Sequence, residues 1–175
     1  MNMSIYDLVS EGRSKALVEK ILNAVGSDPE KVDTLIDLIE NAEKHVSFNA
    51  GWVLYHLLEN KNIEWSRYFD KLWPLLKDNI LPAVARSILK YLWYLDKWPD
   101  DKFTEVADHL LQYVADPGAP IAYQALSMEA LYKHLNPYPE LLEELKLILE
   151  QGMPYGSAGY KNKAQKLVRK INKYN

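Results

Sequence analysis

The chain has 175 residues, of which 48% are apolar and 26% are charged, and it contains no cysteine. Its length suits one domain and its composition is that of a globular protein, which excludes a disordered or fibrous chain. The lack of cysteine excludes disulfides, catalytic thiols and cysteine-ligated zinc. The first residues lack the basic and apolar regions of a signal peptide, and no apolar run reaches the roughly 18 residues that cross a bilayer. We therefore expect a cytoplasmic protein that makes no membrane contact.

Charge is distributed unevenly along the chain. The net charge is −3, but residues 152–175 carry six lysines and arginines and no acidic residue, which leaves −9 on the other residues. Neutralisation of phosphates by lysine and arginine supplies most of the affinity of duplex-binding proteins. The acidic body therefore makes nucleic acid an unlikely principal partner.

Helical spacing of apolar residues runs through the whole chain, and no segment shows the alternation of a β-strand. A helix pair is predicted to begin at Asp28, a good N-cap, with Pro29 in its first turn. Pro74 lies inside a later helix, where we expect a bend. The predicted pairs occupy residues 4–25, 28–60, 64–95, 99–135 and 137–174.

One apolar template recurs in the second helix of each pair. It is clearest in residues 80–95, where an alanine is followed by apolar residues three, four and seven positions later. A small residue at the start of the stripe lets a neighbouring helix come close. The template begins at Ala50, Ala85, Ala125 and Ala164, and a weaker copy begins at Ser14. This periodicity predicts an all-α repeat fold in a single domain, residues 1–175.

Paired helices that recur every 35–40 residues resemble the HEAT and armadillo class of α-solenoid. The run L-W-P-L-L at residues 72–76 is similar to the proline-bearing first helix of a HEAT unit, and residues 82–86 resemble the start of its second helix. The resemblance implies a right-handed α-α superhelix of about four to five HEAT/armadillo-like helix pairs. It also implies that the second helices line the concave surface.

A closer resemblance is to small bacterial HEAT-like proteins, through residues 49–54, 144–151 and 156–161. Some of those proteins carry the label adenylosuccinate lyase. The mobile loop of that lyase has a second serine and a Met-Pro pair, which residues 156–162 lack. Lyase-related activity is therefore only a remote alternative for this chain.

The helical period selects the residues of the second helices that point away from the apolar stripe. This predicted concave face is rich in aromatic side chains, which make good anchors in protein interfaces. An alternative interpretation is that these side chains pack between adjacent repeats. The aromatic, histidine and lysine residues that the helical period selects for this face are Phe48, Trp52, Tyr55, His56, Lys90, Tyr91, Tyr94, Tyr123 and His134.

The last helix, about residues 158–173, carries the strongest charge feature. Its basic residues lie opposite an apolar stripe, and they are Lys163, Lys166, Arg169, Lys170 and Lys173. One interpretation is a terminal cap, because the last repeat of a solenoid needs a polar outer face and cations suit a helix C-terminus. The other is a docking site for an acidic partner, RNA or DNA, beside Tyr155 and Tyr160.

No catalytic motif stands out. The four histidines have no metal-ligand spacing, and no nucleophile elbow or glycine-rich phosphate loop occurs, so we expect neither a metal nor a cofactor. These observations favour a non-catalytic scaffold that binds a peptide or protein on its concave face. The alternative is a HEAT-like glycosylase of the DNA-alkylation-repair type, or another nucleic-acid binder. The identity of the partner and the oligomeric state stay open.

Overall fold

The structure is a computed structural model that describes residues 3–77 and 81–173. Within these residues all regular structure is helical and no strand occurs, so the predicted all-α class is confirmed. The chain divides into two compact units, residues 1–91 and residues 92–175. The predicted single domain over residues 1–175 stays a prediction.

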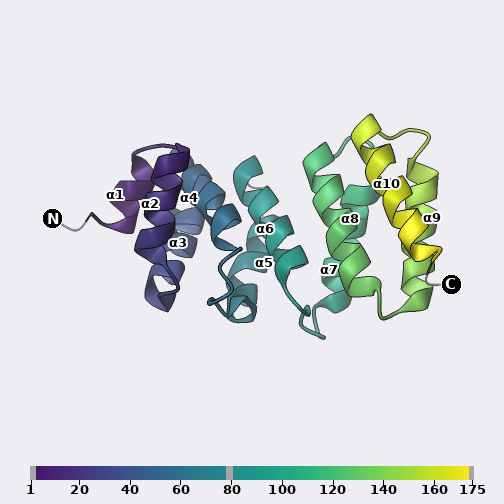
Figure 1. Cartoon of the computed structure of the whole chain (residues 1–175), viewed down its shortest axis with the longest axis horizontal. Helices are drawn as coiled ribbons and strands as arrows, with labels where there is room; N and C mark the ends of the chain where they lie inside the picture. Colours follow the sequence, from purple (N-terminus) through teal and green to yellow (C-terminus); the bar gives the residue numbers. More distant parts are fainter. Residues whose placement is uncertain (1–2, 78–80, 174–175) are drawn as a thin grey trace. The chain divides into compact units, whose positions relative to one another are not determined.

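The first unit is built from short helices that pack on their chain neighbours (Figure 1). Within it, α4 lies against α1, α2 and α3. In chain order the elements are α1 (Ile5–Ser10), α2 (Lys15–Val25), α3 (Pro29–Asn41), α4 (Lys44–Leu57), the 3-10 helix η1 (Trp65–Tyr68), α5 (Phe69–Lys77) and α6 (Pro82–Tyr94). The last three residues of α6 belong to the second unit.

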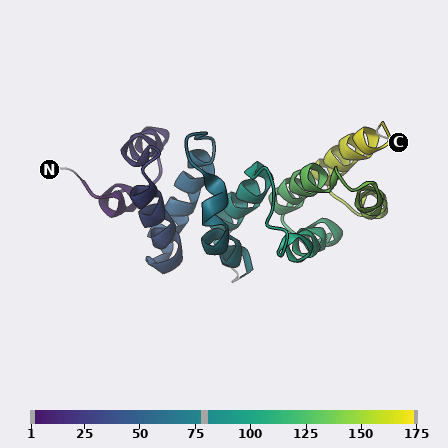
Figure 2. The ribbon, with the colours of Figure 1, turned by 90° about the horizontal axis from the view of Figure 1, so that it is seen from below.

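The second unit continues with two helix pairs, which Figure 2 shows nearly end-on for α7 and α9. Helix α8 packs against α7, α9 and α10, and α9 packs against α7 and α10. The elements are α7 (Phe103–Ala115), α8 (Ile121–Leu135), α9 (Pro139–Gly152) and α10 (Ala158–Ile171).

Local sequence signals explain where several helices begin. Asp28 accepts a hydrogen bond from the Glu30 backbone N–H, with Pro29 at the first helical position, as predicted. At the front of α1, Ser4 and Asp7 form a reciprocal capping box. Ser157 is the N-cap of α10, where its hydroxyl oxygen accepts a hydrogen bond from the Tyr160 backbone N–H.

The predicted apolar stripes form the core. The alanines at positions 50, 85 and 164 are buried with the apolar residues of their stripes, except Val168, which is half-buried like Ala125. The third predicted pair begins with four buried aromatic residues, which are divided between η1 (Trp65 and Tyr68) and α5 (Phe69 and Trp73). Pro74 lies within α5, as predicted.

Helices α4 and α6 approach each other closely at Gly51. A Cβ atom built on Gly51 would lie 2.8 Å from Cγ2 of Val84 and 3.1 Å from its backbone N and Cα. Next to this contact, the Ser87 hydroxyl donates to the carbonyl oxygens of Gly51 and Ala83. Glycine is therefore needed at position 51 to keep the two helix backbones at this distance.

We predict that Gly51→Ala destabilises the protein by about 1–3 kcal/mol, because the new methyl group meets the backbone of α6. Helix propensity alone would give the opposite sign, since alanine is favoured over glycine by about 1 kcal/mol in a helix. Chemical denaturation measures the difference. The control is Gly159→Ala in α10, where the new methyl group would lie 3.2 Å from the exposed side chain of Ile121, which can move. Equal or higher stability of Gly51→Ala would show that the close approach is absent.

Candidate functional site

Helix α4 brings together three of the residues that the sequence selects for a binding face. Trp52, Tyr55 and His56 are half-buried on one side of the helix. The ring centroid of His56 lies 5.6 Å from that of Trp52 and 5.6 Å from that of Tyr55, both in edge-to-face geometry. Each of these residues is partly exposed, and the Lys90 ammonium group lies 4.0 Å from the centre of the Tyr55 ring.

A groove of about 530 Å³ continues the same side of α4 toward its N-terminus. Phe48, which the helical period selects, forms its apolar part, and the Arg13 guanidinium lies 4.5 Å from the centre of the Phe48 ring. Arg13 is a residue that the sequence analysis missed, because it comes from the turn before α2 and no local pattern links it to α4. The groove is lined by Arg13, Glu43, Lys44, His45, Phe48, Asn49 and Leu81.

Lys90 is not part of an exposed face, which corrects the prediction. Its side chain is buried, and its ammonium group donates to the Tyr55 carbonyl oxygen at 2.9 Å and to Glu59 Oε1 at 2.9 Å. The Tyr55 carbonyl lies in the last turn of α4, where backbone acceptors have no helical partner. Lys90 therefore caps α4, and its hydrogen bond holds the pKa of Glu59 below the ordinary value.

Tyr91 also lies in the core instead of on the predicted face. It is fully buried, and its hydroxyl donates to the Trp65 carbonyl oxygen in η1 at 2.9 Å. Burial raises the pKa of Tyr91. The packing interpretation is therefore correct for Tyr91, since this side chain holds the start of the third pair in place.

We predict that Tyr91→Phe lowers the free energy of unfolding by about 1–3 kcal/mol, because the buried Trp65 carbonyl loses its partner. The matched control is Tyr94→Phe, in the next turn of α6, where the tyrosine is half-buried. Thermal or denaturant unfolding compares the two variants. Equal effects would contradict a specific role for the Tyr91 hydroxyl.

His134 is also buried, so it does not lie on the concave face, where it was predicted. Its ring stacks on Trp98 with centroids 4.1 Å apart. The His134 Nε2–H donates to the Leu92 carbonyl oxygen at 3.0 Å, and Trp98 Nε1–H donates to the same oxygen at 2.8 Å. Burial, together with the nearby Lys133, lowers the pKa of His134 to about 4.

Lys133 completes this cap at the end of α6. Its ammonium group donates to the carbonyl oxygens of Trp93 at 2.9 Å, Tyr94 at 3.3 Å and Leu95 at 2.7 Å. Desolvation lowers the pKa of Lys133. No local sequence pattern indicates this role, because the acceptors lie 38–40 positions earlier in the chain.

The low pKa of His134 makes stability depend on pH. Between pH 6.5 and about 4 the unfolded chain binds a proton at His134 and the folded chain does not, so stability falls as pH falls through this window. We predict a loss of about 3 kcal/mol from this residue, which levels off below pH 4. Denaturant unfolding at several pH values measures it.

Two variants test the assignment. His134→Gln can still donate to Leu92 but cannot titrate, so its stability should vary less with pH than that of the parent protein. His45→Gln changes an exposed histidine and should keep the parental pH dependence. A His134→Gln variant with the full parental dependence would contradict the assignment.

The remaining predicted aromatic residues of the second unit lie partly open. Tyr123 is half-buried, with its ring centroid 5.5 Å from that of Tyr113 in edge-to-face geometry. Tyr94 is half-buried beside the exposed Trp93, with ring centroids 6.2 Å apart.

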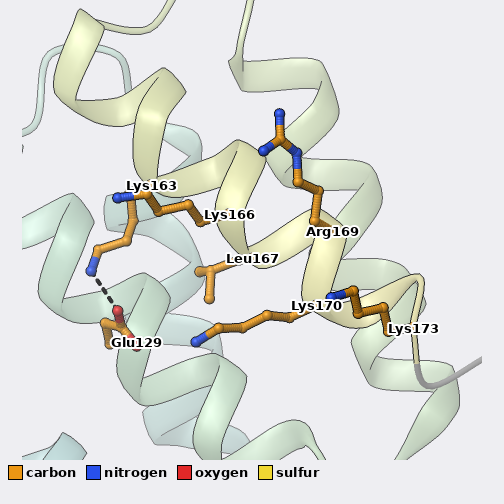
Figure 3. Close-up of a pocket in the computed structure, with 7 residues that line it drawn as sticks. All are labelled: Glu129, Lys163, Lys166, Leu167, Arg169, Lys170 and Lys173. Carbon is orange, nitrogen blue, oxygen red and sulfur yellow. Dashed lines mark hydrogen bonds and ion pairs between the residues drawn. The ribbon is translucent and has the colours of Figure 1, made fainter.

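The basic residues of α10 form one side of a pocket of about 260 Å³ that faces α8 (Figure 3). Lys163 and Lys170 extend toward Glu129 of α8, with Leu167 between them, whereas Arg169 points away from Glu129. Lys163 is ion-paired with Glu129. The pocket thus gathers all five predicted basic residues, with Glu129 and Leu167.

The tyrosines expected beside this helix are placed differently. Tyr160 is buried, and a Cβ atom on Gly152 or Gly156 would come within 2.1 Å or 2.5 Å of its side chain. The two glycines therefore make room for the ring, and Tyr160 is not available to a partner. Tyr155 is 80% exposed, but it does not line the pocket.

The described residues show neither a metal-binding cluster nor a membrane-spanning helix. Residues 3–77 and 81–173 contain no group of three or more histidine, aspartate or glutamate side chains placed to hold a metal ion. Among the helices in the same residues, none is both long and apolar enough to cross a membrane.

Comparison with known proteins identifies the family. A family model of the HEAT repeat domain matches residues 7–171, nearly the whole chain. The chain belongs to the HEAT repeat domain family. The predicted HEAT-like resemblance and α-helical repeat class are thereby confirmed, while the right-handed superhelix stays a prediction. No curated protein and no solved structure matches the chain.

Proposed function

We propose that this HEAT repeat protein is a non-catalytic scaffold that binds a peptide or a segment of a partner protein on the exposed side of α4. The observation that carries the proposal is the groove at Phe48, together with the ring cluster of Trp52, Tyr55 and His56 on the same helix. Helical-repeat proteins bind partners on their extended surfaces, so the fold supports the proposal by analogy.

The chemistry of the groove fits a peptide with an apolar or aromatic anchor. Phe48 supplies an apolar surface, and the Arg13 guanidinium above its ring supplies donors to a backbone carbonyl or a carboxylate. Lys44 adds a second cation at the rim. Aromatic side chains that are half-buried before binding lose little rotamer freedom when a partner covers them, which favours their use as anchors.

We predict that Phe48→Ala and Trp52→Ala each weaken partner binding about thirtyfold, or about 2 kcal/mol, while the melting curve stays close to that of the parent. Affinity capture from native extract, with and without nuclease treatment, identifies the partner, and calorimetry with the purified partner measures the variants. The control is Tyr155→Ala, an aromatic truncation of equal kind in the second unit, at an 80% exposed residue.

Two outcomes would overturn the proposal. One is recovery of nuclease-sensitive material alone, in equal amount with Phe48→Ala and the parent. The other is a partner that binds both α4 variants as tightly as it binds the parent protein.

A further inference from the structure

The distribution of charge along α10 is not explained by a terminal cap. Cations stabilise the last turn of a helix, where Arg169 and Lys170 lie. Lys163 and Lys166 lie before the last turn of the helix, where the macrodipole gives them little stabilisation. They nevertheless line the same pocket as the cations of the last turn.

Little of this positive charge is neutralised within the protein. Among the described residues, Glu129 is the one carboxylate that lines the pocket, and it is paired with Lys163. The ammonium group of Lys170 lies 5.3 Å from the centre of the Tyr132 ring. Within the part of the chain that the structure describes, Lys166 and Lys173 have no hydrogen-bond or ion-pair partner for their ammonium groups. The pocket therefore keeps a net charge of +4, from five cations and one carboxylate.

We propose that this pocket between α10 and α8 binds an acidic peptide segment of a partner protein. Carboxylates of the segment pair with Lys166, Lys170 and Lys173, which offer charge-assisted donors. The volume of about 260 Å³ accommodates a few side chains rather than a large domain.

The lining of the pocket favours a peptide over nucleic acid. Proteins that bind single strands combine cations with aromatic rings on which bases stack. Among the described residues no aromatic side chain lines this pocket, Tyr160 is buried, and the body of the protein outside residues 152–175 carries −9. Carboxylates need only the cations. The site shares no residue with the groove on α4, so its test is independent of the proposed function.

Fluorescence anisotropy of the full chain at low salt tests the proposal. The probe is a labelled peptide of repeated Glu-Glu-Leu units, and the reference probes are the same peptide with glutamine in place of glutamate and an oligothymidylate of equal charge. We expect the acidic peptide to bind, the glutamine peptide not to bind, and added salt to weaken the complex.

Matched variants locate the binding on the pocket. Lys166→Glu should weaken peptide binding about tenfold, because it removes one attraction and adds one repulsion. Lys161→Glu makes the same change of charge at an exposed lysine of α10 that does not line the pocket, and should change affinity less than about twofold. Glu129→Gln should tighten binding about threefold, since it frees Lys163. Melting curves confirm that each variant is folded.

Three outcomes would overturn the proposal. The first is no binding of the acidic peptide by the parent protein at low salt. The second is an equal loss with Lys161→Glu and Lys166→Glu, which would mean diffuse attraction to the helix. The third is tighter binding of the oligothymidylate than of the peptide, which would assign the pocket to nucleic acid.

Discussion

The fold depends on how the carbonyl groups at the ends of its short helices are satisfied. Each α-helix leaves its last carbonyls without a helical partner, and short helices have the largest share of such groups. Here polar side chains from other elements of the same unit supply the donors, namely Asn49 for α1, Lys31 and Asn60 for α2, Ser47 for α3, Lys90 for α4, Lys133, His134 and Trp98 for α6, and Gln124 for α7. Because a buried unpaired carbonyl costs about 1–3 kcal/mol, each of these bonds also fixes how one element sits against another.

The same bonds limit which residues can serve function. A lysine that caps a helix is not available to bind a ligand. The ammonium group of Lys90, for example, donates hydrogen bonds to Tyr55 and Glu59. Close backbone packing imposes a second limit, since Gly51 brings Val84 of α6 against α4. A polar or aromatic position on a second helix is therefore available to a partner only when neither capping nor packing uses it.

This explains which features the sequence could predict. The helical period is local, so it identified the helices, the apolar stripes and the side of α4 that carries Trp52 and Tyr55. Capping is not local: Lys90 acts on a residue 35 positions away and His134 on one 42 positions away. From one sequence, these donors have the same period and residue type as exposed side chains. The placement of Tyr160 was wrong for a similar reason, because Gly152 and Gly156 make room for its ring and a glycine in the sequence does not indicate which side chain it accommodates.

The distinction between engaged and unengaged cations also bears on the nucleic-acid alternative. Counting lysines and arginines treats Lys133 and Lys166 alike, but Lys133 donates to three backbone carbonyls, whereas Lys166 has no such partner in the described part of the chain. Affinity for nucleic acid depends on lysines and arginines that contact phosphates and release their counterions. A lysine whose ammonium group is bound to backbone oxygens is poorly placed to contact a phosphate. Lysines without such partners line the α10 pocket, and its described lining includes no aromatic side chain on which a base could stack. This lining supports the proposed binding of a short acidic segment.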